Sequence, residues 1–258
     1  MKYFVFSDVH GYYSVLKEEL IRAGFDEFNP NHKLISIGDN FDRGPENYLM
    51  FSFLKRMKAN DKIILIRGNH EDLLLRMLQS RNVTLSDIQN GTYDTIEQFA
   101  YEFFKESGKG IFFLDFSTLY KKLQDEEFFD LLYGMSDYFE TEKYVFTHGF
   151  IPLLPEYNFN PMWRLATKTE FEEARWTNGM RMSIEYNFGI DDKKIVVGHW
   201  HTSYGHIRRI YGNDASLNYR KLEFAVDADF SIYEDSNVIA IDAATAYTNQ
   251  VNIFVFEE

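Results

Sequence analysis

The sequence predicts an α/β fold, and three observations carry the prediction. Seven short runs rich in β-branched and aromatic residues have the length of strands and end at turn or charged residues. Patterns of helical spacing lie between these runs, most regularly in the first third of the chain. The chain has 258 residues, of which 45% are hydrophobic, enough for one large domain with a substantial core. We therefore expect a single domain over residues 1–258, with right-handed crossovers between its parallel strands.

The expected strands are short runs that turn or charged residues bound on both sides. They cover residues 3–6, 34–37, 63–66, 144–146, 195–197, 238–241 and 251–256. Helical patterns separate the first three of them, which favours a sheet in which strands alternate with crossover helices.

Three helical patterns are the clearest. Ser14 is expected to cap the first of them, whose apolar residues lie on one side, and Gly24 suits the position after its last turn. The second is an apolar stripe over residues 49–57. The third, over residues 96–104, repeats apolar residues at i, i+3, i+4, i+7 and i+8 and is the strongest helix prediction.

Residues 78–139 contain no run that clearly predicts a strand and are rich in helical patterns. We expect them to form a helical insertion within the same domain. Their Phe and Tyr residues repeat at helical spacing, which predicts aromatic stripes that face the core. A binding groove is the alternative interpretation of these stripes.

The acidic composition limits the partners of the protein. The chain carries 40 Asp and Glu against 27 Lys and Arg, a formal net charge of −13. Such a field repels polyanions, so we expect neither nucleic acid nor a membrane as a partner. The chain has no cysteine, which excludes disulfides, thiolate ligands and a cysteine nucleophile. No run is as long as a membrane span and no signal-peptide core follows Met1, so we expect a soluble, cytoplasmic protein.

Polar, chemically active residues follow five of the predicted strands at the point where each strand ends. Five of the seven histidines lie in these loops, together with two aspartates and an asparagine. These residues are Asp8, His10, Asp39, Asn69, His70, His148, His199 and His201. Because loops at the carboxyl ends of strands gather on one edge of an α/β sheet, we expect these side chains to converge on one site.

Imidazoles and carboxylates without sulfur suit Zn, Mn or Fe. Asp8 and His10 stand two residues apart, so in an extended segment their side chains point the same way, and His199 and His201 repeat this spacing. There are more candidate ligands than one cation needs. Two cations that share a bridging carboxylate use the set more fully, and such pairs are the recurring solution for in-line displacement at phosphorus.

The order of these motifs resembles the calcineurin-like metallophosphoesterase superfamily. The motifs are Asp-x-His at 8–10, Gly-Asp-x-x-Asp-Arg-Gly at 38–44, Gly-Asn-His-Glu at 68–71, His-Gly at 148–149 and Gly-His-x-His at 198–201. The Asp-Arg-Gly and Arg-Gly-Asn-His-Glu forms look most like its phosphoprotein phosphatase and diadenosine tetraphosphatase branch. The resemblance spans most of the chain and implies two mixed β-sheets sandwiched between helices, with the helical insertion around 78–139.

The resemblance also implies a ligand set for two divalent metal ions, with Mn expected and Fe or Zn as alternatives. Asp8, His10 and Asp39 would hold one ion, and Asp39 would bridge to the second. Asn69, His148 and His199 would complete the second site. The additional His201 is expected to reach back to the first ion, as in family members with His-x-His at this place.

The catalytic roles that the resemblance implies fall on three further side chains. His70 would be the general acid, and Asp42 would orient and charge its imidazole. Arg43 would clamp the oxygens of the phosphate. A second phosphate-binding arginine is expected after His148, and the candidates are Arg175, which we favour because it precedes an Asn-Gly turn, and Arg164.

Glu71 and Arg67 are expected to form a buried support pair and not to touch the substrate. The His-x-His motif and the helical insertion differ from the protein phosphatase pattern, which leaves the substrate open.

The sequence thus predicts a metal-dependent phosphoric ester hydrolase in which a hydroxide that bridges the metals attacks phosphorus. We expect a Ser/Thr phosphatase-like phosphomonoesterase. The alternatives are a dinucleoside polyphosphate (diadenosine tetraphosphate) hydrolase, a phosphodiesterase and, more remotely, a non-catalytic metal-binding regulatory module. The expected partner is a phosphorylated substrate: a phosphoprotein, a nucleotide or a small phosphoester.

Overall fold

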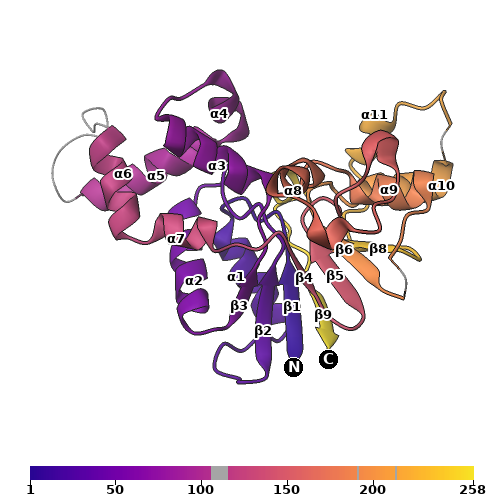
Figure 1. Cartoon of the computed structure of the whole chain (residues 1–258), viewed down its shortest axis with the longest axis horizontal. Helices are drawn as coiled ribbons and strands as arrows, with labels where there is room; N and C mark the ends of the chain where they lie inside the picture. The colour runs from indigo at the N-terminus through magenta and orange to yellow at the C-terminus, as the bar shows by residue number, and fades with distance from the viewer. Residues whose placement is uncertain (106–115, 191, 213) are drawn as a thin grey trace.

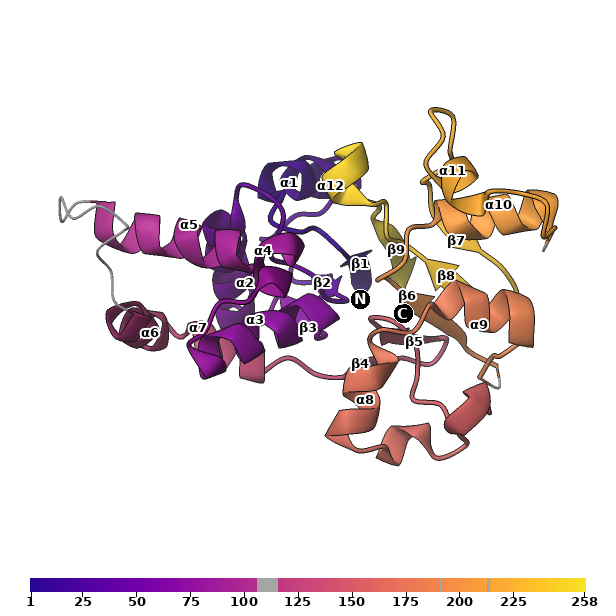
Figure 2. The same ribbon diagram turned by 90° about the horizontal axis from the view of Figure 1, so that it is seen from above.

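The computed structural model describes residues 1–105, 116–190, 192–212 and 214–258. Two β-sheets pack against each other at its centre, and helices cover the outer face of each sheet (Figures 1 and 2). The first sheet has the order β3-β2-β1-β9. In it β1 (Lys2–Phe6), β2 (His32–Ser36) and β3 (Ile63–Leu65) are parallel, and β9 (Phe254–Glu257) runs antiparallel to β1.

The second sheet has the order β4-β5-β6-β8-β7. Its three central strands are parallel, and both edge strands run antiparallel to their neighbours. The strands are β4 (Tyr138–Glu140), β5 (Tyr144–Thr147), β6 (Lys194–Val197), β7 (Tyr233–Glu234) and β8 (Val238–Ala240). The expected α/β fold with two mixed sheets between helices is confirmed. All seven predicted strands are present, whereas the short edge strands β4 and β7 were not predicted.

The two sheets pack face to face because their strands alternate between two apolar layers. In β1, Phe4 and Phe6 face the helices while Val5 faces the other sheet. In β6, Ile195 faces its own helices and Val196 faces the first sheet. The buried layer between the sheets consists of Val5, Ile35, Ile37, Ile66, Phe146, Val196, Ile239, Ile241 and Phe256. This layer fixes the distance between the strand ends of the two sheets.

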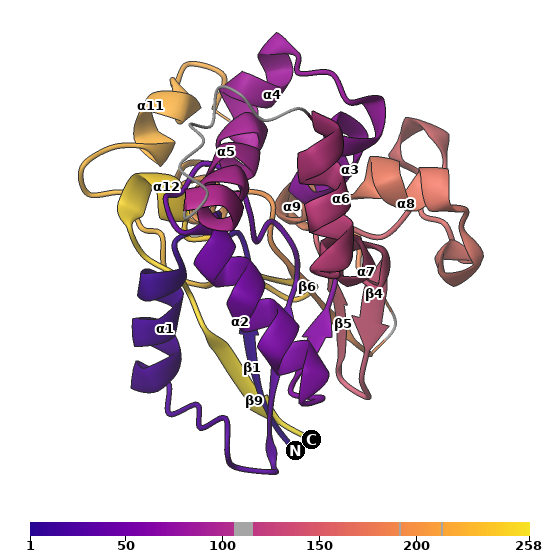
Figure 3. The same ribbon diagram turned by 90° about the vertical axis from the view of Figure 1, so that its left-hand side faces the viewer.

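The helices over the first sheet agree with the patterns in the sequence. They are α1 (Tyr13–Arg22), α2 (Asn47–Ala59), α3 (Asn69–Ser80), α4 (Leu85–Asn90), α5 (Thr92–Phe104), α6 (Phe116–Asp125) and α7 (Phe128–Tyr133). Figure 3 shows α1 and α2 side by side in front of the first sheet. Gly24 adopts a positive φ of 85° just after α1, as expected, but Ser14 lies inside the helix and donates hydrogen bonds to Glu46.

The insertion is helical over its described residues, except that β4 begins within its last residues. Residues 106–115 of the insertion lie outside the described residues. Its aromatic stripe faces the core: Phe99 is fully buried and its ring contacts Phe51 and Phe128. The insertion therefore extends the core of the first sheet.

Shorter helices cover the second sheet. They are α8 (Lys168–Ala174), α9 (Gly179–Tyr186), α10 (Ser203–Tyr211) and α11 (Tyr219–Glu223), and α12 (Thr245–Thr248) follows β8. Two 3₁₀ turns, at Pro155–Tyr157 and Trp163–Leu165, lie between β5 and α8. Among the described residues, no helix has the length and apolar character that crossing a membrane requires.

Glu140 of β4 ties the edge of the second sheet to two neighbouring segments. Its carboxylate accepts hydrogen bonds from Arg164 (Nε, 2.8 Å, and Nη2, 2.6 Å) and from Lys193 (Nζ, 2.6 Å). The hydrogen bonds from Arg164, together with Lys193, lower the pKa of Glu140 from 4.5 to about 2. Since the folded state has the lower pKa, this interaction stabilises the protein above about pH 4.5 and is lost as the pH falls towards 2.

We expect Glu140→Gln to lower the free energy of unfolding at pH 7 by about 1 kcal/mol, the upper range for an ion pair near the surface. Urea denaturation at pH 7 and at pH 3 measures the effect, and the difference between variant and wild type should shrink at pH 3. Glu142→Gln, two residues after Glu140 in the turn that follows β4, is the matched control and should change stability less. If the difference in free energy of unfolding between variant and wild type were the same at pH 7 and at pH 3, the role assigned to the charge of Glu140 would be contradicted.

Candidate metal centre

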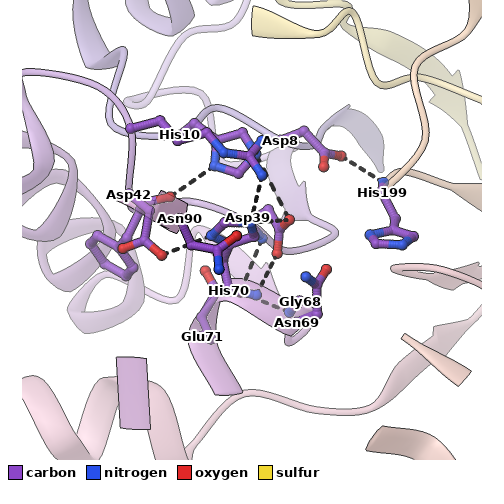
Figure 4. Close-up of polar contacts among 12 residues, drawn as sticks. Asp8, His10, Asp39, Asp42, Gly68, Asn69, His70, Glu71, Asn90 and His199 are labelled. Carbon is purple, nitrogen blue, oxygen red and sulfur yellow. Dashed lines mark hydrogen bonds and ion pairs between the residues drawn. The ribbon is translucent and has the colours of Figure 1, made fainter. Parts of the chain in front are cut away.

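Loops from both sheets meet at one end of the sandwich and surround a pocket of about 270 Å³. Most of the predicted site residues line it: Asp8, His10, Asp39, Arg43, Asn69, His70, His199 and His201. Figure 4 shows six of them gathered at the ends of different strands: Asp8, His10, Asp39, Asn69, His70 and His199. The structure therefore brings together residues that lie up to 193 positions apart in the chain, from 8 to 201.

The Asp39 carboxylate lies between two groups of potential metal ligands. Its Oδ2 atom is 3.8 Å from Nε2 of His10 and 3.9 Å from Nε2 of His70. Its Oδ1 atom is 3.3 Å from Nε2 of His148, and His199 completes this second group. In each group the donor atoms lie within 4.8 Å of one another. One carboxylate shared by two such groups is the arrangement that a pair of neighbouring cations requires.

Asp8 and His201 line the pocket beside these two groups, and the Asn69 carboxamide adjoins the second group. Asp8 accepts hydrogen bonds from the Ser7 hydroxyl and from the amide of His199. Asn69 places Oδ1 2.8 Å from Nε2 of His148. Metal ligation by these three residues stays a prediction.

Hydrogen bonds from the ring nitrogens set the orientation of three imidazoles. Nδ1 of His10 donates to the Phe41 carbonyl at 2.9 Å, and Nδ1 of His148 donates to the Ile37 carbonyl at 2.8 Å. Nδ1 of His201 donates to the Ser203 hydroxyl at 2.9 Å. Because a carbonyl only accepts, Nδ1 carries the proton in the first two rings. Their Nε2 atoms face the Asp39 carboxylate, as a shared metal site requires.

Buried carboxylates make the pocket a favourable place for cations. Burial, with the neighbouring Asp242, raises the pKa of Asp8 well above its ordinary value. Burial also raises the pKa of Asp242 to about 6. Burial alone would lower the pKa of His148, but the attraction of Asp39 outweighs it and raises that pKa to about 10. Buried carboxylates thus favour a positive charge in their midst, and nitrogen and oxygen donors without sulfur fit Mn, Fe or Zn.

His70 is held by a buried hydrogen-bonded network. Its Nδ1 atom donates to Oδ2 of Asp42 at 2.7 Å. The hydroxyls of Thr92 and Thr95 donate to the same carboxylate at 2.9 and 2.7 Å. This leaves Nε2 of His70 facing the pocket, where Arg43 donates to it at 2.8 Å. The two threonines come from α5, so the helical insertion supports the imidazole that is expected to act as the acid.

Arg43 bridges the two histidines of the first ligand group, His10 and His70. Its Nη1 donates to Nε2 of His10 at 2.9 Å while its Nη2 donates to His70. Among the residues that the structure describes, it is the one arginine that lines this pocket. Its position therefore agrees with the expected phosphate contact, which stays a prediction.

The structure does not bring Arg175 or Arg164 to the pocket, which corrects the expectation of a second phosphate-binding arginine there. Arg175 is buried, with Nε 2.6 Å from Asp72 and Nη1 2.8 Å from Asp137. Its guanidinium is occupied by two carboxylates that lie far away in the sequence. Arg164 binds Glu140 at the edge of the second sheet. Neither of them lines the pocket.

Many loop residues of the site have left-handed backbone conformations although they are not glycine. These are Asp8, His10, Asp39, Asp42, Arg43 and His199, with φ between 49° and 76°. Such conformations are unfavourable for residues with a Cβ atom and persist where the surrounding structure fixes them. Strain is thus concentrated in the loops that carry the candidate ligands.

Glu71 is one of the groups that fix these loops. Its carboxylate accepts hydrogen bonds from the amides of Gly68, Asp39 and Asn40 at 2.8, 3.0 and 2.8 Å. The expected pair with Arg67 is wrong, because Arg67 instead donates to the Leu132 carbonyl. Gly68 is required by the same geometry, since a Cβ atom here would overlap the Asp39 carboxylate.

Asp242 is a buried acidic residue of the pocket that is not among the site residues expected from the sequence, although the segment Ile241-Asp242 belongs to the resemblance. It follows β8 by two positions, as the predicted ligands follow their strands. The signal was therefore present in the sequence, at the end of the run 238–241.

Comparisons with known proteins agree with this geometry. A family model described as calcineurin-like phosphoesterase matches residues 1–233. The bis(5'-nucleosyl)-tetraphosphatase PrpE [asymmetrical] of Bacillus mycoides is 30% identical over 129 residues, which cover 47% of this chain and 50% of that protein. Serine/threonine-protein phosphatase 2 of Escherichia coli is 34% identical over 76 residues, 30% of this chain and 32% of that protein.

The chain thus matches about half or less of the length of these curated relatives. Among solved structures, the cold-active protein-tyrosine phosphatase of a psychrophilic Shewanella species aligns over 100% of this chain and 75% of its own, with a TM-score of 0.54 and 18% identity. This likeness supports the fold.

We expect Glu71→Gln to lower the free energy of unfolding by about 2–3 kcal/mol, because a carboxamide has one acceptor oxygen where the carboxylate receives several buried N–H groups. Urea denaturation with and without added Mn²⁺ measures the change, and the gain in stability from Mn²⁺ should shrink in the variant. Glu18→Gln, on the exposed side of α1, is the control. A variant as stable as the wild type would contradict the role assigned to Glu71.

Proposed function

The chain belongs to the calcineurin-like phosphoesterase family, and we propose that within it the chain is a phosphomonoesterase that acts with two divalent metal ions. The observation that carries the proposal is the Asp39 carboxylate, which two groups of potential ligands share. One of these groups contains His70, whose Nδ1 atom is held by the buried Asp42 carboxylate while its imidazole lines the pocket. Asp8, His10 and Asp39 would hold one ion and Asn69, His148 and His199 the other, with His201 in reach of the pocket. Mn is the expected metal, with Fe or Zn as alternatives.

Metal ions bound at such a site lower the pKa of water and make a nucleophile available near neutral pH. The protein itself supplies the proton that the leaving oxygen requires. Nε2 of His70 faces the pocket while Nδ1 is held by the buried carboxylate of Asp42. That carboxylate stabilises the charged imidazolium, so His70 can donate a proton from Nε2 to the leaving oxygen.

Arg43 has a matching role in phosphate binding. Its Nη1 and Nη2 atoms donate to the Nε2 atoms of His10 and His70. Nε2 of His10 would be taken up by a metal ion and Nε2 of His70 by a proton, and neither atom then accepts from Arg43. The planar guanidinium then has N–H groups available for two oxygens of a phosphoryl group, the geometry in which arginine binds phosphate.

A monoester suits this charge arrangement better than a diester, because its extra negative charge matches the cations and Arg43. The named relatives support two kinds of reaction. One relative is a serine/threonine-protein phosphatase and the other is a bis(5'-nucleosyl)-tetraphosphatase. We take the Ser/Thr phosphatase-like reaction, release of inorganic phosphate from a monoester, as the leading function. Hydrolysis of a dinucleoside polyphosphate is the second candidate, because an aromatic pocket adjoins the metal centre.

The reaction class is tested by product analysis with protein loaded with Mn²⁺. Glycerol 3-phosphate, a phosphoserine peptide, AMP, diadenosine tetraphosphate and a phosphodiester are offered separately. We expect inorganic phosphate from monoesters and slow cleavage of the diester. Cleavage of the diester alone would contradict the proposal, and no hydrolysis with Mn²⁺, Fe²⁺ or Zn²⁺ would favour a regulatory metal-binding module.

We expect His70→Asn to lower kcat for glycerol 3-phosphate by roughly 10²–10⁴-fold while the metal content stays unchanged. The loss should be smaller for p-nitrophenyl phosphate, whose leaving group needs no proton. Phosphate release and elemental analysis measure the two quantities. His206→Asn is the matched control, because His206 does not line the pocket.

Undiminished turnover in His70→Asn would remove the acid role from this residue. A fall in metal content would instead make His70 a ligand, which its 3.9 Å distance from Asp39 permits. Asp39→Asn provides the comparison, because loss of the shared carboxylate should weaken both metal sites together.

A further inference from the structure

A second pocket adjoins the metal centre. It has a volume of about 510 Å³, nearly twice that of the pocket between the ligand groups. Trp176 lines both pockets, so they meet at its side chain. We call the larger one the side pocket; Trp176, Trp200, Tyr204, Asn178 and Arg181 are among its lining residues. A substrate with its phosphoryl group at the metal centre can therefore extend into the side pocket.

The two tryptophans of the side pocket flank a candidate metal ligand. The ring of Trp176 lies 5.8 Å from that of His199, at 83°, and the ring of Trp200 lies 6.0 Å from the same imidazole, at 63°. Both indoles are nonetheless open to solvent, 48% for Trp176 and 37% for Trp200. Exposed indole faces beside a reactive centre are suited to stack on a planar ring, since such stacking contributes affinity without requiring a particular base.

The charged groups of the side pocket balance one another. Arg181 donates to Glu185 at 2.7 Å, and the hydroxyl of Tyr204 lies 3.4 Å from the same carboxylate. The other two charged lining residues, Arg208 and Glu173, are again one cation and one anion. A pocket with no net charge favours a neutral ring over a further phosphate or a basic peptide segment.

The polar groups of the side pocket also suit a ring with a hydrogen-bonding edge. Asn178 uses Oδ1 to accept from the amide of Arg181 at 3.0 Å, so its Nδ2 group is the donor that it can offer to a ligand. Glu185 offers carboxylate oxygens as acceptors. A nucleobase can use both kinds of group, whereas a phenyl ring can use neither.

We propose that the side pocket binds the nucleobase of a nucleoside phosphate whose phosphoryl group lies at the metal centre. This inference rests on the proposed function and names its substrate class: a nucleotide in place of a phosphopeptide. Trp176 and Trp200 hold the base by stacking, and the polar groups around Asn178 and Glu185 bind its edge. Arg43 and the candidate metal ligands hold the phosphate.

The test compares AMP with glycerol 3-phosphate, which has no ring. Binding of AMP is measured calorimetrically with the full chain, with and without Mn²⁺, and kcat/KM is measured with Mn²⁺ for both compounds and for a phosphotyrosine peptide. We expect Trp176→Ala and Trp200→Ala to raise the Kd and KM for AMP about ten- to a hundredfold, the range for loss of one stacked base. The fall in kcat/KM for AMP should exceed the fall in kcat/KM for glycerol 3-phosphate at least tenfold. Trp200→Phe should restore most of it, and Tyr101→Ala, an exposed aromatic on α5, is the control.

Three outcomes overturn the inference. Equal losses for AMP and glycerol 3-phosphate would mean that the tryptophans only position His199. A loss confined to a phosphotyrosine peptide would make an aromatic side chain the occupant, and unchanged AMP binding in both alanine variants would remove the tryptophans from binding. If the wild type hydrolyses neither compound but binds AMP through Trp176 and Trp200, the proposed function fails while the nucleobase site stands.

Discussion

The candidate site depends on a group of carboxylates buried where the strands of both sheets end. Asp39 lies at the centre of this group, with imidazoles on either side of it, and Asp8 and Asp242 complete it. Carboxylates kept this close and away from water repel one another unless positive charge lies between them. This requirement explains why histidines and an arginine surround the carboxylates, and why the donor atoms face inward.

The loops that carry these groups are strained, and other parts of the chain fix them. Glu71 binds the amides of the loops after β2 and β3. Thr92 and Thr95 of the insertion bind Asp42, which in turn holds His70. The insertion thus contributes to the site by supporting a carboxylate, although none of the metal ligands expected from the sequence lies in it.

Much of the fold and of the site could be predicted because both depend on local patterns. Strand-length apolar runs and the motifs that follow them are visible without knowledge of distant contacts, and β1, β2 and β6 are examples. The edge strands β4 and β7 each contain a glutamate and are partly exposed, so neither of them forms a continuous apolar run. Arg175 was misassigned because its partner Asp72 lies 103 positions away in the chain, and no local signal shows that a guanidinium is already paired. The role of Glu71 depends on backbone amides, which every sequence contains.

The candidate ligands are divided between the two sheets. The first sheet contributes Asp8, His10, Asp39 and Asn69, and the second contributes His148, His199 and His201. A folding intermediate with only one sheet formed would hold an incomplete set of candidate ligands. The candidate metal centre would consequently form late in folding, when the two sheets pack against each other, and separation of the sheets would disperse the ligands before the protein unfolds completely.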